Sequence, residues 1–396
     1  MAAIINAVSG GAGGIQVAGD TTGQLQLQTG GTTAMTVNAS QQASFVNNVN
    51  MPNTFGFKNR VINGAMMIDQ RYGGTQATPT DGAYVLDRYI FSASQSSKYT
   101  VQQTPSTTET NYTGRLAAGF TNYIAITSSS AYSVGSNELF AMQQRIEGNN
   151  TADLMWGTNY AKTVTVSFWA YSSLTGNFGF ALTNGTVYNS YTASYSIPVA
   201  NTWTYVTITI PGPTSGTWPT NTSCGLNLFW VLGAGTSRQT AAGVWTASPS
   251  PGSTYYQSPP SPVQVVGTSG ATLYITGVQL EVGTQATSFD YRDYGRELIM
   301  CQRYFEVGVN LIDCYANSSN AVFGNAPFKA TKRATPTVTD QGLSYNGLTV
   351  TNFAVGISSV TYSDGFSTIH NAIVNGGAPS TGAARWLSIF TASAEL

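Results

Sequence analysis

Carboxylates are the side chains of this sequence best suited to catalysis, and they are few: the 396 residues include seventeen Asp and Glu. Hydrolysis of a glycosidic bond needs two carboxyl groups about 5 to 9.5 Å apart. Residues 154 to 280 contain neither Asp nor Glu. The candidates flank this stretch, and no two of them form a recognisable motif: Asp69, Asp81, Asp87, Glu138, Glu147, Asp153 and Glu281. We therefore expect no catalytic residue, although a groove shared between subunits could still bring two carboxylates together.

Nucleophilic and metal chemistry have as little support. The single histidine, His370, cannot supply an HExxH pair or a centre with several histidine ligands. The sequence also lacks GxSxG and GxxxxGK[ST], so neither a hydrolase nucleophile nor a phosphate-binding loop is indicated. Cys224, Cys301 and Cys314 are too far apart for CxxC spacing and odd in number, so we interpret them as buried thiols. The prediction is no metal site and no cofactor.

Aromatic side chains give a more specific signal, because an exposed indole face beside Asn and Thr donors can stack on a sugar ring. The chain has seven tryptophans. Trp169 and Trp230 fall inside strand-like runs and are predicted to be buried. The better candidates for glycan contact lie among Pro, Gly and Ser in expected loops: Trp218, Trp245, Tyr255 and Tyr256. An interface or structural role for these four is the alternative.

Charge is scarce throughout the chain. Charged residues make up 8% of it, against about 25% in a typical soluble domain. Sixteen basic and seventeen acidic side chains give a net charge of −1, so no positive field attracts a polyanion and nucleic acid is not expected as a partner. No apolar run approaches the roughly 18 residues that cross a bilayer, and no secretory signal is visible, so we expect no membrane insertion.

Residues 15 to 49 contain a ten-residue repeat of apolar positions separated by Gly and Asn turns. The pattern predicts short strands that each present two apolar side chains on one face. Fifty residues of this kind bury too little surface to be stable alone. We therefore predict that residues 1–54 attach the chain and form a homotrimer with a core of Ile15, Val17, Leu25, Leu27, Met35, Val37 and Phe45. Docking of the segment onto the next domain is the alternative.

The rest of the chain is expected to be all-β apart from one helix. Residues 55–292 alternate strand-like runs with Gly, Asn, Ser and Pro clusters, which is typical of a sandwich. Its clearest runs are Thr163–Tyr171, Trp203–Ile210, Leu226–Leu232 and Thr272–Val282. Residues 293–306 have helical apolar spacing and are predicted to form a connector helix. The charges gathered from Glu281 to Glu306 indicate a domain junction, either a salt-bridged hinge or a subunit contact. Residues 307–396 are predicted to form a smaller C-terminal β domain.

Several blocks resemble a family of bacteriophage virion fibre proteins, often labelled tail fibre or carbohydrate-binding-module-like. They stand in the same order over residues 57–306: FKNRVINGAMMIDQR (Phe57–Arg71), QRIEGNNTADLMWGTNYAKTVTVSFWAYSSLTGNFGFAL (Gln144–Leu182), NTWTYVTITIPG (Asn201–Gly212) and ITGVQLEVGTQATSFDYRDYGRELIMCQRYFE (Ile275–Glu306). The resemblance implies a jelly-roll sandwich in residues 55–292, a place in the phage particle and a homotrimer. It carries over no catalytic residue. Related carbohydrate-binding jelly rolls often hold a structural calcium ion, whose ligands here would have to be backbone carbonyls and a carboxylate such as Glu281, without support from a motif.

The leading interpretation is a trimeric, non-enzymatic phage fibre that recognises a glycan on the host surface. It would be made in the host cytoplasm and end in the virion, as a tail or head appendage. Its partners would be its sister chains, other virion proteins such as tail tube, nozzle, adaptor or capsid, and the glycan. Two alternatives stay open: a purely architectural head-decoration or tail-adaptor protein, and a polysaccharide depolymerase with a site between subunits.

Overall fold

The computed structural model describes residues 25–29, 32–37, 43–45, 58–105, 113–248, 255–318, 321–326, 328–345, 348–349, 353–357, 368–374 and 382–396. The chain divides into two compact units, Met1–Thr54 and Phe55–Leu396. Regular structure in both is almost entirely β-strand, so the predicted all-β class is confirmed. Within the described ranges, no helix is long and apolar enough to cross a bilayer.

The first unit contains a three-stranded antiparallel sheet, β1 (Leu25–Thr29), β2 (Thr32–Val37) and β3 (Ala43–Phe45). Its register joins predicted apolar positions across neighbouring strands: Leu25 with Val37, Leu27 with Met35, and Met35 with Phe45. Met35 and Val37 are half-buried. Outside the described parts lie Ile15, Val17 and the side chains of Leu25, Leu27 and Phe45. The trimer core therefore stays a prediction.

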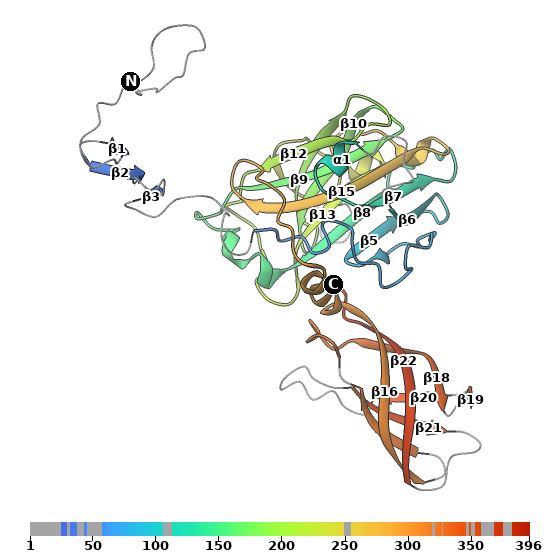
Figure 1. The fold of residues 1–396 in the computed structure, drawn as a ribbon. Coiled ribbons are helices and arrows are strands. Elements are labelled where there is room, and N and C mark those ends of the chain that lie inside the picture. The colour runs from blue at the N-terminus through green and yellow to red at the C-terminus, as the bar shows by residue number, and fades with distance from the viewer. Residues whose placement is uncertain are drawn as a thin grey trace. The chain divides into compact units, whose positions relative to one another are not determined.

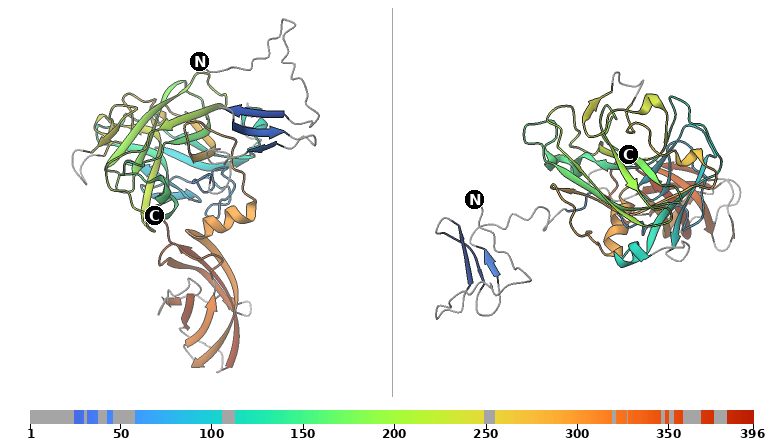
Figure 2. Two further views of the ribbon diagram at one scale, coloured as in Figure 1. Left: turned by 90° about the vertical axis from the view of Figure 1, so that its left-hand side faces the viewer. Right: turned by 90° about the horizontal axis from the view of Figure 1, so that it is seen from above.

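The second unit begins with a sandwich of two antiparallel sheets, seen in Figure 1 and from two further sides in Figure 2. One sheet has the strand order β14-β11-β10-β13-β8-β5-β4, with bounds Trp245–Ala247, Asn189–Ile197, Gly176–Asn184, Cys224–Ala234, Leu139–Glu147, Tyr89–Ala93 and Ala83–Leu86. The other has the order β12-β9-β15-β7-β6, with bounds Thr204–Ile210, Val164–Ser172, Thr272–Val282, Asn122–Ser128 and Tyr99–Pro105. Because the chain passes repeatedly from one sheet to the other, the sandwich has the predicted jelly-roll form, and the four clearest predicted runs correspond to β9, β12, β13 and β15.

The core lies between the two sheets. On β9, the side chains of Val164, Val166 and Phe168 alternate inward and are fully buried. Phe168 meets the ring of Trp230 from the opposite sheet at a centroid distance of 5.7 Å. Trp230 is fully buried, which confirms its predicted position. Each such side chain contributes about 1.5 to 3 kcal/mol by leaving water, so this interior can hold the sandwich together without charged groups.

Helix α2 (Tyr294–Gln302) is shorter than the predicted helix over 293–306. Asp293 caps its start, because its side chain accepts a hydrogen bond from the Arg296 backbone N–H at 2.9 Å. Phe305 and Glu306 already belong to strand β16 and pair with β22 near the end of the chain. The predicted end was wrong because this pairing partner is distant in sequence and overrides the local helical spacing.

The C-terminal strands form one seven-stranded antiparallel sheet in the order β19-β18-β22-β16-β17-β21-β20. Their bounds are Leu348–Thr349, Thr337–Tyr345, Gly382–Ser393, Phe305–Ser318, Ala321–Ala326, Thr368–Val374 and Phe353–Ile357. The longest pairing joins β16 to β22, the first and last strands of the sheet in sequence. His370 lies on β21 and Cys314 on β16, and the side chains of both fall outside the described parts.

The charged residues around α2 form ion pairs. Arg303 donates to Glu147 of the sandwich at 2.8 Å, and Lys332 donates to Glu306 at 2.7 Å with both side chains buried. Burial raises the pKa of Glu147, but hydrogen bonds from Arg303 and Tyr304 outweigh that effect and hold it below its ordinary value. The junction is thus salt-bridged, as the charge distribution predicts.

Glu395 joins the end of the chain to the sandwich. Its carboxylate pairs with Arg71 at 2.9 Å and with Arg88, whose side chain is 1% exposed. The Arg88 guanidinium also lies 3.5 Å from the ring centroid of Tyr304. Burial lowers the pKa of Arg88, but the nearby Glu395 carboxylate raises it by more than burial lowers it. The net shift is therefore upward, and the guanidinium stays charged. One carboxylate therefore pairs with two guanidinium groups at this contact.

Asp87 gives the fold a specific pH dependence. Burial raises its pKa from 3.8 to about 6, although Gln70 donates hydrogen bonds to both of its oxygens. Between about pH 4 and 6 the folded chain keeps a proton that the unfolded chain loses, so this group's contribution to stability falls as the pH rises. A shift of this size corresponds to about 3 kcal/mol. Because the unfolded carboxyl is already partly ionised at pH 4, we expect the free energy of unfolding of the wild type to fall by about 2 kcal/mol relative to that of Asp87→Asn between pH 4 and 7, as measured by urea titrations; parallel curves would contradict the assignment.

Candidate functional site

The outer face of the five-stranded sheet carries the candidate site. Because Val164, Val166 and Phe168 face the core, Ser167 and Trp169 of β9 point the opposite way. The register places Trp169 directly between Tyr205 of β12 and Thr276 of β15. Trp169 is only half-buried, so its predicted burial was wrong. A strand-like run does not by itself imply burial, because alternate side chains point to opposite faces, and the alternation along β9 places Trp169 on the outer face.

A bulge in β15 shapes the floor of the site. The pairing of β15 with β9 shifts between Thr276 and Gln279, and Gly277 within the shift has a φ of +63°. A Cβ added to Gly277 would lie 2.6 Å from the ring of Phe120. Glycine is thus needed for two reasons, its backbone angle and the close approach of an aromatic ring.

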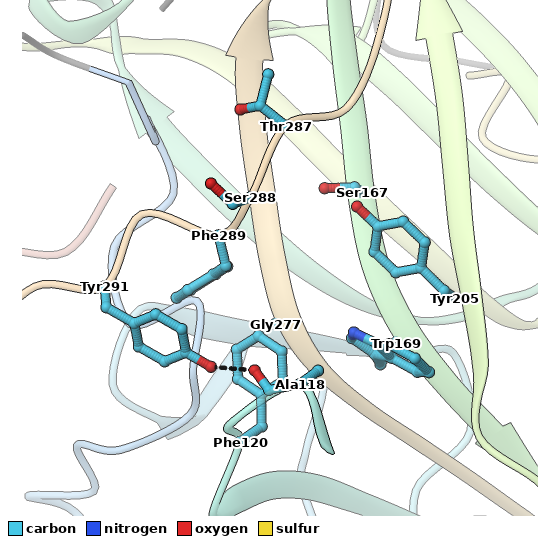
Figure 3. Close-up of a pocket in the computed structure, with 10 residues that line it drawn as sticks. All are labelled: Ala118, Phe120, Ser167, Trp169, Tyr205, Gly277, Thr287, Ser288, Phe289 and Tyr291. Carbon is cyan, nitrogen blue, oxygen red and sulfur yellow. Dashed lines mark hydrogen bonds between the residues drawn. The ribbon is translucent and has the colours of Figure 1, made fainter. Parts of the chain in front are cut away.

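Two chain segments border the site beyond β15. Helix α1 (Thr113–Ala117), a five-residue helix not predicted from the sequence, lies against the outer face and leads to Phe120. After β15 the chain returns with Phe289 and Tyr291, and the three rings lie 4.8 to 5.5 Å apart between centroids. The Tyr291 hydroxyl donates to the Ala118 carbonyl at 2.5 Å, the dashed line in Figure 3. This hydrogen bond joins the two segments.

The space between these elements, here called the outer-face pocket, has a volume of about 380 Å³. Figure 3 shows Trp169 and Tyr205 on one side of β15, and Phe289 and Tyr291 on the other. Trp169 and Tyr205 lie 5.3 Å apart between ring centroids, and Tyr205 is 45% exposed. None of the described residues that line the pocket is charged.

Polar groups available to a ligand lie beside the rings. Within the described ranges, Trp169 Nε1, the Tyr205 hydroxyl and the Ser167 hydroxyl have no hydrogen-bond partner from the chain. Exposed ring faces with a few orienting donors and no charge suit a neutral ligand that combines apolar faces with hydroxyl groups. The described residues that line the pocket include no carboxyl, imidazole or thiol group.

A second aromatic group on the same face is covered. Tyr123, Tyr171, Trp203 and Tyr274 pack together, with the rings of Tyr171 and Tyr274 stacked at 5.1 Å. Arg115 of α1 lies over Tyr123 at 4.9 Å and is fully buried. The helix therefore closes this part of the face and leaves the pocket as the exposed part.

The tryptophans and tyrosines predicted to contact glycan lie elsewhere in the sandwich. Trp218 and Trp245 are brought together, 5.3 Å apart between ring centroids, and both pack on the buried ring of Trp156. Tyr255 and Tyr256 are half-buried. None of the four lines the outer-face pocket. Their predicted contact with glycan stays a prediction.

The seven candidate carboxylates are all held by donors of the chain. Two accept hydrogen bonds from backbone N–H groups alone: Asp69 from Tyr72 and Gly74, and Asp81 from Ala93. Two are paired with arginine: Asp153 with Arg60, and Glu147 with Arg303, with a further bond from the Tyr304 hydroxyl. The other three accept from uncharged donors: Asp87 from Gln70, Glu138 from Gln95, Tyr132 and Gly135, and Glu281 from Gln279 and Thr287. None of them lines the outer-face pocket.

Glu281 does not fit the role of the carboxylate ligand of a structural calcium ion. Its Oε1 accepts from Gln279 Nε2 and the Thr287 backbone N–H, each at 2.8 Å, and its Oε2 accepts from the Thr287 hydroxyl at 2.6 Å. A cation requires oxygen ligands where these donors lie. Over the part of the chain that the structure describes, no three His, Cys, Asp or Glu side chains are grouped to hold a metal.

The two described thiols are unreactive in their surroundings. Cys301 is buried and Cys224 half-buried, and neither is in a disulfide. Burial raises the pKa of Cys224 to about 11 and that of Cys301 well above its ordinary value. Both thiols are therefore protonated at neutral pH, as expected of structural cysteines.

A scan against protein-family models and a search of curated proteins find no match to the chain. Among solved structures, the enzymatically active domain of bacteriophage CBA120 tailspike protein 4 aligns over 57% of this chain and 21% of its own, with 10% identity and a TM-score of 0.27. A putative sugar binding protein from Bacteroides thetaiotaomicron aligns over 57% of this chain and all of its own, with 11% identity and a TM-score of 0.34. A family 11 carbohydrate-binding module from Clostridium thermocellum aligns over 54% and 98%, with 11% identity and a TM-score of 0.25. This chain spans about a fifth of the tailspike domain, and no residue role is transferred from these structures.

The close packing at Gly277 leads to a mutational prediction. Gly277→Ala forces a side chain into a left-handed backbone and against Phe120, so we expect a loss of about 2 to 4 kcal/mol in the free energy of unfolding. Gly243→Ala is the matched control, because Gly243 also has a positive φ, +82°, but nothing lies within 4 Å of its added Cβ. The control should lose only about 1 to 2 kcal/mol. Equal losses in urea titrations would show that Phe120 does not pack there.

Proposed function

We propose that the chain is a subunit of a phage virion fibre that binds a neutral glycan of the host surface without cleaving it. The outer-face pocket is the observation that carries this proposal. Its half-exposed Trp169 and Tyr205 rings can stack on the apolar face of a sugar, and the donors beside them can bind its hydroxyls.

The absence of charge in the pocket lining supports a neutral glycan over an acidic one. A carboxylate on a uronic or sialic acid would lose its hydration on entering the pocket, and no described lining residue offers a cation to replace it. The stretch from 154 to 280, which supplies β9, β12 and most of β15, has only Lys162 and Arg238 as basic residues, and this scarcity of cations fits the same preference.

The engagement of the seven candidate carboxylates supports a role in binding rather than in cleavage. Two carboxyl groups would have to flank the scissile bond, and the described residues that line the pocket include none. The depolymerase alternative would need a site between subunits.

The place in the virion and the homotrimer rest on the sequence. The blocks from Phe57 to Glu306 resemble phage fibre proteins, and the paired apolar positions of β1 to β3 suit a segment that needs sister chains to cover it. Three pockets on one fibre would strengthen attachment through multivalency even if each binds weakly. Sedimentation of the full chain should give a trimer; a folded monomer would contradict this part.

A glycan array probed with the full-length protein tests the binding proposal. We expect signals on neutral glycans and none that depends on uronic or sialic acid. No binding to any glycan, together with no inhibition of phage adsorption by the protein, would favour the architectural alternative. Release of reducing ends from a bound polysaccharide would favour the depolymerase.

A further inference from the structure

A second, smaller pocket lies beside the tryptophans that the sequence singles out. Its volume is about 170 Å³, and it is lined mainly by Leu154, Met155, Trp156, Trp218 and Leu226, with no charged side chain among the described lining residues. An apolar cavity of about 150 Å³ holds a molecule of benzene size, whereas sites for whole small-molecule ligands span about 300 to 1,000 Å³. The pocket therefore suits a substituent better than a sugar ring.

Both indoles of this pocket present carbon to it. Trp156 Nε1 donates to the Lys162 carbonyl at 2.7 Å, and Trp218 Nε1 donates to the Ser215 carbonyl at 3.1 Å. Their rings meet edge to face, 4.9 Å apart between centroids. In the outer-face pocket, by contrast, Trp169 Nε1 has no partner within the described chain. The two pockets thus differ in chemistry: an indole N–H is available to a ligand in the outer-face pocket, whereas the second pocket presents indole and aliphatic carbon, with threonines as its polar lining residues.

The indoles are fixed in position before any ligand arrives. Trp245 packs on both rings, and its own Nε1 donates to the Pro211 carbonyl at 2.7 Å. The loop that carries Trp218 approaches Gly157 so closely that an added Cβ there would lie 2.6 Å from the Gly216 carbonyl oxygen. A rigid apolar pocket loses little entropy when it binds a small group.

Met155 stands at the mouth of this pocket in an unusual conformation. Its φ of +55° is disfavoured for a residue other than glycine, and the residue is 44% exposed. The Thr158 hydroxyl donates to its carbonyl at 2.6 Å and stabilises this backbone. Such outliers concentrate at binding sites, and a methionine side chain adapts readily to an apolar group.

We propose that this second pocket binds an acetyl substituent carried by a neutral glycan. The methyl group would lie between the indoles and the leucines. The exposed Thr220 hydroxyl at the rim, which has no partner among the described residues, would donate to the acetyl carbonyl oxygen. A glycan as the carrier rests on the function proposed above, whereas the preference for an acetyl group rests on this pocket alone.

NMR of the protein labelled with ¹⁵N-tryptophan tests the proposal. The indole N–H signals are recorded as N-acetylglucosamine or glucose is added, two sugars that differ at the acetamido group. N-acetylglucosamine should shift the Trp156 and Trp218 signals with a Kd in the millimolar range, roughly the affinity available to so few atoms, and glucose should bind there at least about tenfold more weakly. Equal shifts with both sugars, or no shift with either, would overturn the proposal.

Thr220→Tyr blocks the mouth from an exposed position and should abolish the shifts. Thr214→Tyr, exposed in the same loop but not lining the pocket, should leave them unchanged. Retention of the shifts in Thr220→Tyr would contradict the assignment. The Trp169 signal separates the two proposals. Glycans that shift the Trp169 signal but never those of Trp156 or Trp218 would support the proposed function and overturn the acetyl site. Glycans that shift the Trp156 and Trp218 signals but never that of Trp169 would support the acetyl site and contradict the proposed function of the outer-face pocket.

Discussion

Trp169→Ala is expected to weaken binding of the neutral glycan at least about 30-fold. The indole supplies one of the two stacking faces of the outer-face pocket and lies beside Tyr205 at 5.3 Å between centroids. Truncation of an aromatic residue at the centre of a binding site costs about 2 kcal/mol or more, which corresponds to this factor. Because the side chain points away from the sandwich core, the fold should survive. Isothermal titration with the glycan that gives the strongest array signal measures the effect.

Two variants control for Trp169→Ala. Trp169→Phe keeps a ring but loses the Nε1 donor, so it should retain part of the affinity. Tyr160→Ala removes a ring that is 79% exposed and does not line the pocket, so it should bind like the wild type. Unchanged affinity in Trp169→Ala, with the thermal unfolding transition preserved, would place the glycan elsewhere.

Glu395→Ala is expected to lower the free energy of unfolding by about 3 to 5 kcal/mol. The change leaves the guanidinium of Arg88, 1% exposed, and that of Arg71, 14% exposed, without their shared carboxylate. Removal of one partner from a buried ion pair has this cost because the remaining charge stays poorly solvated. Urea unfolding of the full-length chain, followed by tryptophan fluorescence, measures the loss.

Glu395→Gln separates charge from shape. It retains one carbonyl oxygen to accept a hydrogen bond but removes the negative charge, so it should fall between the wild type and Glu395→Ala. Glu138→Ala is a control at a surface carboxylate that pairs with no buried cation, and it should lose about 1 kcal/mol or less. A loss in Glu395→Ala no larger than in this control would mean that the contact adds nothing to stability.

The fold could be predicted from the sequence where local pattern decides it. Alternation in runs such as Thr272–Val282 defines strands whose bounds the structure reproduces, and Gly and Pro clusters define the loops between them. The end of α2 could not be predicted in this way, because Phe305 is drawn into β16 by pairing with a strand near the other end of the chain. Local propensity carries no information about that partner.

The site was harder to predict than the fold. Trp169 could have been found, since the inward Val166 and Phe168 fix the direction of their neighbours. Phe120 and Tyr291 could not, because they lie far apart in sequence and meet only through the return of the chain after β15. The predicted loop tryptophans Trp218 and Trp245 do not line the outer-face pocket.

Hydroxyl-radical footprinting of the full-length protein, with and without the neutral glycan, tests the central claim most directly. If the outer-face pocket binds the glycan, oxidation of Trp169, Tyr205 and Tyr291 should fall when it is added, while that of the exposed Tyr160 stays constant. Unchanged oxidation of Trp169 and Tyr205 at a saturating concentration of a glycan that demonstrably binds would contradict it.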